Sequence, residues 1–155
     1  MCKKHASIQL IYGTNGSGKS QMVRDLMKKK GSYLFQFNDY FAQDYVNKDY
    51  AESMFTMLTG KKVSDILFLS HSQRIILMFC YELEAILEME QPYTRLFIDG
   101  FPCVLDKSIV EGLLNLFLFL DTLDFKITIT TCNKDIKDYC VAFFEGWSNF
   151  KLIET

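Results

Sequence analysis

The feature that most constrains this chain is the run Gly13-Thr14-Asn15-Gly16-Ser17-Gly18-Lys19-Ser20, which fits the pattern Gly-x-x-x-x-Gly-Lys-Ser/Thr. It follows a short apolar run at residues 8–12 and precedes a helix-like segment at residues 21–30. In this context the pattern marks a phosphate-binding loop, because small residues let backbone N–H groups close around phosphate oxygens. The helix that begins there adds the positive end of its dipole. We expect Lys19 to reach the β- and γ-phosphates of a nucleotide and Ser20 to bind Mg²⁺.

The bulk composition is that of an ordinary soluble protein. A chain of 155 residues is long enough for one domain with a real core, and its 49% hydrophobic and 23% charged residues fit that class. The formal net charge of −2 gives no support for nucleic-acid binding. The longest apolar stretch, residues 113–120, is too short to span a bilayer, and no signal peptide is apparent. We therefore expect a cytoplasmic protein that meets a membrane only through a partner.

The cysteines do not form a recognisable metal or disulfide pattern. There are five of them, and no Cys-x-x-Cys or Cys/His pair has the spacing of metal ligands. Their odd number and scatter are typical of a reducing compartment.

Hydrophobic periodicity predicts strands that alternate with helices in a single domain spanning residues 1–155. Strands are expected at residues 7–12, 32–37, 95–98 and 126–131, and a closing strand, turn and strand across residues 141–153. Helices are expected at residues 19–30, 72–89 and 108–120, with a short one capped by Asn133 and an irregular aromatic-rich one at residues 38–58. This alternation predicts an α/β fold with three α/β/α layers and a mostly parallel sheet.

A carboxylate ends one of the predicted strands. Asp99 directly follows the apolar run at residues 95–98, and Gly100 comes next. Such an aspartate either begins a turn or, in proteins with a phosphate-binding loop of this kind, holds Mg²⁺. The presence of the loop favours the metal-binding role.

The order of these motifs resembles the nucleotide-binding domain of ABC-type ATPases, including the related chromosome-maintenance and DNA-repair ATPases. Gly13–Ser20 is similar to their Walker A motif, Phe97-Ile98-Asp99 to their Walker B, and Leu69-Ser70-His71-Ser72-Gln73 to their signature at the start of a helix. Weaker similarities follow the same order: Phe35-Gln36 to the Q-loop, Leu105-Asp106 to the D-loop, and residues 129–135 to the switch strand. The resemblance spans residues 8–153.

The resemblance implies a reduced ABC-like P-loop NTPase that binds ATP with Mg²⁺ and acts as a nucleotide-dependent switch or weak ATPase within a larger assembly. It also implies an ATP-induced homodimer, or a heterodimer with another ABC-type subunit, and a further protein partner that the segment 38–58 would face. The nucleotide contacts it implies are Asn15, Gly16, Ser17, Gly18, Lys19, Ser20, Gln21, Gln36 and Ser70, and the implied metal ligands are Ser20 and Asp99. Gln36 is the candidate for sensing the γ-phosphate.

Three departures from the family pattern bear on catalysis. Gly100 stands where the family has its catalytic glutamate, Cys132 stands at the switch histidine, and Ser72 replaces the second signature glycine. Without a carboxylate to position water, we expect slow or absent hydrolysis, and no residue is assigned as catalytic.

A second resemblance gives an alternative. Asp99-Gly100-Phe101-Pro102 is similar to the Asp-Gly-Phe-Pro of adenylate kinases, which transfer the ATP γ-phosphate to a small acceptor. Cys103 stands where those enzymes have arginine, and the chain has only Arg24, Arg74 and Arg95 to clamp phosphates. The two resemblances imply different sheets. An ABC-like fold inserts the strand at 126–131 between the strands that lead to Gly13 and to Asp99, whereas a nucleoside-kinase fold places those two side by side.

Overall fold

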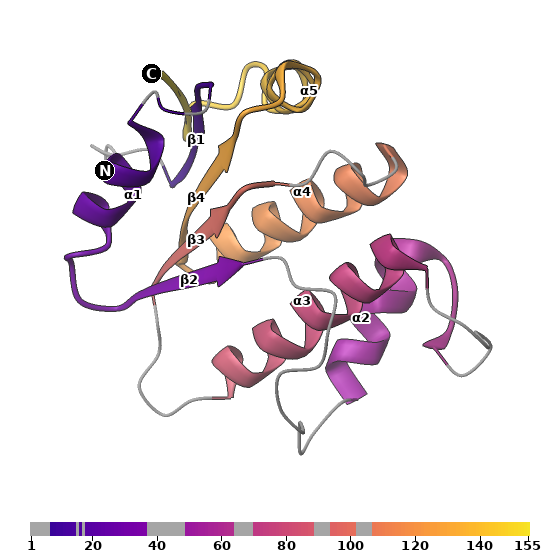
Figure 1. Ribbon diagram of the computed structural model, residues 1–155. Coiled ribbons are helices and arrows are strands. Elements are labelled where there is room, and N and C mark those ends of the chain that lie inside the picture. The colour runs from indigo at the N-terminus through magenta and orange to yellow at the C-terminus, as the bar shows by residue number, and fades with distance from the viewer. Residues whose placement is uncertain are drawn as a thin grey trace. The chain divides into compact units, whose positions relative to one another are not determined.

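The computed structural model describes residues 7–14, 16, 18–36, 49–63, 70–88, 94–101 and 107–155. The chain divides into two compact units, each of which is described by itself. The first unit comprises residues 1–36, 93–103 and 114–155, and the second comprises residues 37–92 and 104–113. Figure 1 shows the sheet of the first unit and the paired helices of the second. Helix α4 (Lys107–Thr122) contributes its first part to the second unit and the remainder to the first.

The first unit is built on a five-stranded sheet with the strand order β2-β3-β4-β1-β5. The strands are β1 (Ile8–Tyr12), β2 (Ser32–Gln36), β3 (Arg95–Asp99), β4 (Lys126–Thr131) and β5 (Phe150–Glu154). Each neighbouring pair is parallel. The α/β class predicted from the alternation of strands and helices is therefore confirmed.

Strand β4 lies between β1 and β3 and pairs with both. Ile129 of β4 is in register with Leu10 of β1 on one side and with Ile98 of β3 on the other. This is the order expected of an ABC-like sheet, and it differs from the order expected of a nucleoside kinase. Because the strands are parallel, the loop after β1 and the residue that ends β3 emerge at the same edge of the sheet.

Helices cover both faces of the sheet, as the opposite placement of α1 (Lys19–Leu26) and α5 (Lys134–Phe143) in Figure 1 shows. On the α1 face, Val23 is buried with Ile11 and Phe97. On the other face, Phe144 at the end of α5 stacks on Phe150 with ring centroids 4.8 Å apart. Since successive side chains of a strand point to opposite faces, the alternating apolar residues of β1, β3 and β5 serve both layers.

The two largest differences from the predicted elements lie at α1 and α5. Helix α1 ends at Leu26 and not at Lys30, because the chain turns back to reach β2. The carbonyl of Gly31 accepts hydrogen bonds from both Thr94 and Arg95 at 3.0 Å, which holds this turn against the start of β3. The strand expected at residues 141–144 is instead the last turn of α5 and its cap, where Cys140 and Phe144 are buried.

The second unit pairs α2 (Asp49–Thr59) with α3 (His71–Leu87). Residues 37–48 of the predicted irregular helix lie outside the described part of the chain. Helix α3 begins at His71, one residue before the predicted start at residue 72. The Ser70 hydroxyl accepts from the Gln73 N–H at 3.2 Å, and the Gln73 side chain accepts from the Ser70 N–H at 2.9 Å. This reciprocal pair is a capping box.

A buried carboxylate connects the two helices. Glu84 of α3 is 1% exposed, and its Oε1 accepts a short hydrogen bond from the N–H of Ala51 in the first turn of α2. The carboxylate therefore caps α2 from a neighbouring helix, where the helix dipole favours negative charge.

We expect Glu84→Ala to lower the free energy of unfolding by about 1–3 kcal/mol, because it leaves the Ala51 N–H buried without an acceptor. Glu84→Gln keeps an acceptor oxygen in place and should retain most of that stability. Urea denaturation followed by circular dichroism compares the two variants. Equal losses in both would show that the charge, and not the acceptor, stabilises the pair.

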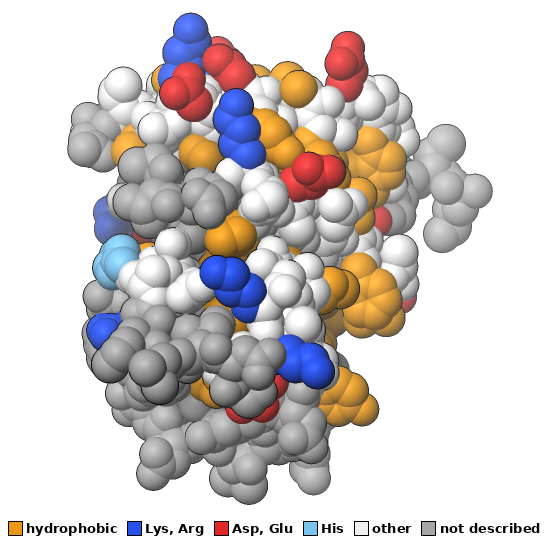
Figure 2. Space-filling view, turned by 90° about the vertical axis from the view of Figure 1, so that its right-hand side faces the viewer, with side chains coloured by type: hydrophobic (Ala, Val, Ile, Leu, Met, Phe, Trp, Pro, Cys, Tyr) orange, Lys and Arg blue, Asp and Glu red, His pale blue; other side chains and the backbone are white. Residues whose placement is uncertain are grey.

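On the face shown in Figure 2, lysine and arginine side chains stand apart from one another instead of gathering into a patch. No helix in the described residues is both long and apolar enough to cross a membrane.

Candidate functional site

The loop after β1 is attached to the sheet at its first residue. The Gly13 N–H donates to the Thr131 carbonyl at the end of β4, at 3.3 Å. Gly16 and Gly18 have φ angles of +85° and +96°, a left-handed conformation that favours glycine. A Cβ added at either position would meet no described atom within 4 Å, so the backbone conformation, and not crowding, requires glycine. Asn15 and Ser17 lie outside the described residues.

Helix α1 opens directly from this loop. Gly18 is its N-cap, and the Gly18 carbonyl accepts from the Met22 N–H at 3.0 Å. The amides of Lys19, Ser20 and Gln21 precede that first intrahelical bond and are free of the helix ladder. The open space beside the two glycines and these amides together suit an anion.

The side chains of Lys19 and Gln21, in the first turn of α1, make different contacts. The Lys19 ammonium donates to the Thr14 carbonyl at 3.2 Å, which holds it over the loop. The Gln21 side chain donates to Asp25 and accepts from Arg24, both at 2.9 Å, so it is engaged along the helix surface. Gln21 therefore offers its main-chain N–H, and not its side chain, to a ligand at the loop.

Asp99 is held in place by a neighbour that the sequence analysis did not assign. The Thr130 hydroxyl, on buried strand β4, donates to Asp99 Oδ1 at 2.8 Å and accepts from the Gly100 N–H at 2.8 Å. The Thr130 carbonyl also accepts from the Phe101 N–H at 2.8 Å. One residue thus orients the carboxylate and fixes the backbone that follows it. The signal for Thr130 is its register beside β3, which becomes visible only when the strand order is known.

Gly100 has a φ of +71°, in the left-handed region. A glutamate at this position would be strained, because L-residues other than glycine rarely adopt that conformation. The backbone conformation at position 100 therefore disfavours a glutamate directly after Asp99.

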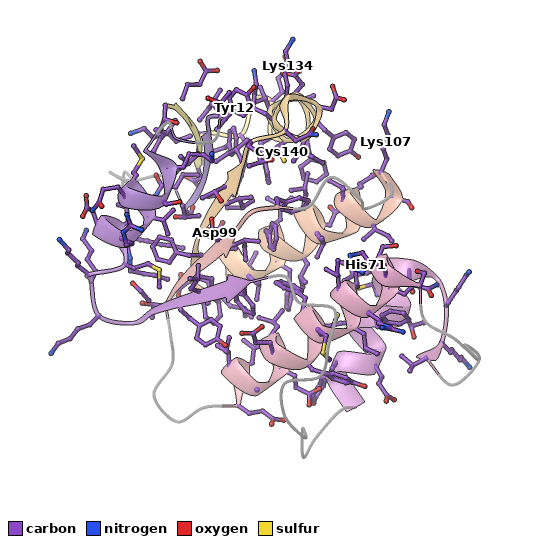
Figure 3. All side chains as sticks on the ribbon, viewed as in Figure 1. Tyr12, His71, Asp99, Lys107, Lys134 and Cys140 are labelled. Atoms are coloured by element: carbon purple, nitrogen blue, oxygen red, sulfur yellow. The ribbon has the colours of Figure 1, made fainter. Side chains whose placement is uncertain are left out.

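Most of the predicted site residues meet at one edge of the first unit. Figure 3 labels Tyr12 and Asp99 at the carboxyl ends of β1 and β3. Since neighbouring strands lie about 4.8 Å apart and β4 stands between, these two ends are roughly 10 Å apart. Gln36 ends β2 in register with Asp99, which places its backbone at the same edge.

Ser70 lies in the second unit, where its hydroxyl caps α3. Leu69 and the Leu105-Asp106 pair lie outside the described residues.

The thiols and acidic groups of the described residues do not form a metal cage. Among the described residues, no group of three or more His, Cys, Asp or Glu side chains is arranged to hold a metal ion. Burial raises the pKa of the Cys140 thiol to about 12 and raises that of Cys80 further, so both remain protonated at neutral pH. Cys132, directly after β4, is exposed.

The chain matches no protein-family model, and a search of curated proteins finds no match. What the fold and site define is an α/β protein with an all-parallel sheet among its described strands and a glycine-rich loop at the carboxyl edge.

Proposed function

We propose that this chain is a cytoplasmic ATP-binding protein of the ABC-like P-loop class, which acts as a nucleotide-dependent switch or weak ATPase within a larger assembly. The observation that carries the proposal is the position of β4 between β1 and β3, with the glycine-rich loop and Asp99 at one edge. The glycine-rich motif favours a phosphate-binding loop, and the strand order, which is independent of it, favours this class over a nucleotide kinase.

The glycine-rich loop and the first turn of α1 would bind the phosphates. No described atom lies within 4 Å of a Cβ built on Gly16 or Gly18, so a phosphate chain would have room beside these glycines. The amides of Lys19 and Ser20 would donate to its oxygens, and the Lys19 ammonium would exchange the Thr14 carbonyl for a phosphate oxygen.

The oxygen donors at this edge fit Mg²⁺. Mg²⁺ is commonly bound by one or two protein oxygens together with phosphates and water, which agrees with a site that lacks a described cage of acidic residues. The Ser20 hydroxyl and the Asp99 carboxylate would hold it, and Thr130 would keep that carboxylate oriented. The bound ion would neutralise charge on the phosphates.

Retention of the nucleotide is favoured over its hydrolysis. No carboxylate follows Asp99, and the left-handed Gly100 is fixed by its hydrogen bond to Thr130. A water molecule would therefore lack a general base at the family's usual position.

The proposal is tested by titrating the protein with a fluorescent ATP analogue, with Mg²⁺ and with EDTA, and by measuring phosphate release and molar mass under the same conditions. We expect Mg²⁺-enhanced binding and turnover far below the roughly 10 s⁻¹ typical of enzymes. An increase in molar mass on adding MgATP would support the two-subunit sandwich. Absence of binding would overturn the proposal, and turnover of several per second that Lys19→Ala abolishes would overturn slow hydrolysis.

Thr130→Val is expected to reduce the Mg²⁺-dependent part of ATP affinity by about 3- to 10-fold, because it removes the hydroxyl that orients Asp99. The ratio of affinities with Mg²⁺ and with EDTA measures this effect separately from any loss of stability. Thr128→Val is the matched control, since it removes a hydroxyl bonded to Gln9 at 3.3 Å on the same strand, away from the carboxyl edge. If the ratio of affinities with Mg²⁺ and with EDTA were the same in the two variants, Thr130 would have no part in the Mg²⁺ site.

A further inference from the structure

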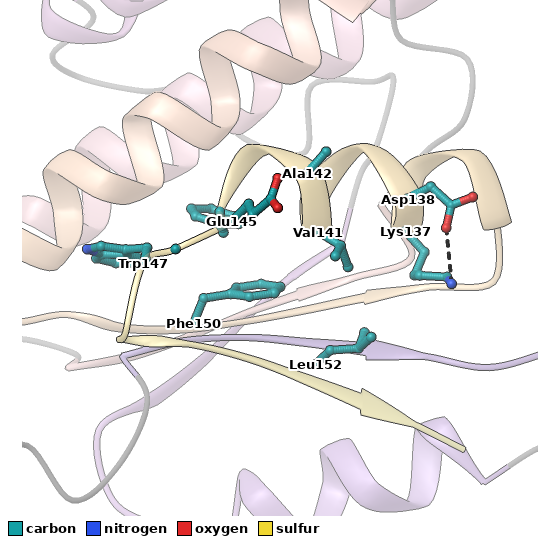
Figure 4. A pocket seen from close by; sticks show the side chains of 10 residues that line it. Lys137, Asp138, Val141, Ala142, Glu145, Trp147, Phe150 and Leu152 are labelled. Atoms are coloured by element: carbon teal, nitrogen blue, oxygen red, sulfur yellow. Dashed lines mark ion pairs between the residues drawn. The ribbon is translucent and has the colours of Figure 1, made fainter.

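A groove runs along the edge of the sheet on the face that α5 covers. It lies between α5 and β5 and has a volume of about 560 Å³, within the range of ligand-binding clefts. Most of its lining residues are apolar, and Val141, Trp147, Phe150 and Leu152 are among them. Phe144 stacks on Trp147 at 5.6 Å and on Phe150 at 4.8 Å, which stabilises the aromatic wall. Figure 4 shows Phe150 and Leu152 pointing from β5 toward α5.

The backbone of β5 offers hydrogen-bonding groups beside this groove. The Asn149 carbonyl accepts from Ile8 at 3.1 Å, and the Thr155 N–H donates to the Tyr12 carbonyl at 2.8 Å, so the odd-numbered residues of β5 face β1. Backbone groups alternate along a strand. Those of Leu152 and Glu154 therefore point outward, where no described strand pairs with them. The backbone groups of Leu152 therefore lie at the outer edge of the described sheet, and its side chain lines the groove.

Acidic side chains stand at both ends of the apolar wall. Figure 4 shows Glu145 beside Trp147 at one end and Asp138 at the other, and Glu154 lies near Asp138 through their shared partner Lys137. Lys137 is largely covered, and it pairs with Asp138 at 3.0 Å and with Glu154 at 3.8 Å. Asp138 and Glu154 therefore share one lysine that is already engaged, and Glu145 stands at the other end, next to Trp147. Lys151 of β5 lies on the opposite face by strand alternation.

We propose that the β5 edge binds an extended segment of a partner protein, which adds a strand to the sheet and places an apolar side chain between two basic ones over the groove. Main-chain bonds to Leu152 and Glu154 would supply affinity, and the groove with its acidic ends would supply specificity. A second copy of the chain suits this edge less well, because it would bring two acidic groove ends together. The proposal does not depend on nucleotide binding.

The probe is a fluorescein-labelled peptide, Thr-Lys-Thr-Phe-Thr-Lys, whose alternate residues place Lys-Phe-Lys on one face. We expect it to bind at least about tenfold more tightly than Thr-Glu-Thr-Phe-Thr-Glu in fluorescence anisotropy, because several ion pairs are replaced by repulsion. Amide hydrogen exchange in the unmodified protein locates the binding. The Leu152 and Glu154 amides should exchange fast without peptide and slowly with it, whereas those of Lys151 and Ile153 should be protected throughout.

Two variants separate the backbone contribution from the charge. Leu152→Pro removes an N–H that the sheet does not use, and it should bind about 3- to 10-fold more weakly than Leu152→Ala, which keeps that N–H. Glu145→Lys should weaken binding by about threefold or more, and Glu52→Lys, with the same change of net charge in the second unit, should not.

The proposal is overturned if the basic peptide shows no preference over the acidic one, or if the Leu152 and Glu154 amides are unaffected by it. It is also overturned if those amides are already protected in a concentration-dependent dimer of the chain, because the occupant would then be a second copy. A folded Leu152→Pro that binds as well as Leu152→Ala would exclude strand addition.

Discussion

Replacing Lys19 by alanine is expected to weaken MgATP binding by about 10- to 100-fold, the largest functional effect of any single change proposed for this protein. Lys19 is the one side chain whose ammonium lies over the glycine-rich loop among the described residues, where it donates to the Thr14 carbonyl at 3.2 Å. A charge-assisted hydrogen bond to phosphate contributes about 1.5–3 kcal/mol, which corresponds to that range of affinity. Equilibrium titration with a fluorescent ATP analogue measures the change.

Lys29→Ala is the matched control for Lys19→Ala. Lys29 is an exposed cation in the turn after α1, so its removal changes the net charge equally without touching the loop. Similar losses in both variants would indicate non-specific attraction of an anion to the basic residues around α1, and the proposed ATP site would be wrong.

Replacing Phe97 by alanine is expected to lower the free energy of unfolding by about 3–5 kcal/mol, the largest loss of stability among these variants. Phe97 is 1% exposed on β3 and is buried with Ile11 and Val23 between the sheet and α1. Alanine would leave a cavity under the helix whose N-terminus forms the site, so weaker ATP binding should accompany the loss. Urea denaturation followed by the fluorescence of Trp147, the single tryptophan, measures it within the same unit.

Phe119→Ala removes the same side chain from the first unit but from its surface, since Phe119 of α4 is 57% exposed. We expect a change within about 0.5 kcal/mol, as is usual for surface positions. A loss in this variant comparable to that of Phe97→Ala would mean that burial of Phe97 under α1 does not explain its effect on stability.

Several element boundaries could be predicted because the local signals were strong. Asn133 carries a capping side chain, and α5 begins directly after it, as predicted. Helix α3 begins one residue before its predicted start. The end of α1 could not be predicted in this way. Lys28 to Lys30 have good helix propensity, but the contacts of Gly31 with Thr94 and Arg95 require the chain to turn earlier. The run at residues 141–144 is apolar enough for either a strand or a helix, and packing of Cys140 and Phe144 decides for the helix.

The glycine-rich loop, its flanking strand and helix, and the carboxylate at the end of β3 could be predicted from the sequence alone, because each depends on residues that are neighbours in the chain. The strand order, the two hydrogen bonds of the Thr130 hydroxyl and the left-handed Gly100 became visible only in the tertiary structure. So did the outward edge of Leu152 and the acidic ends of its groove. These features join residues far apart in sequence, and which strand lies beside which is decided by packing of the whole sheet and not by any local pattern.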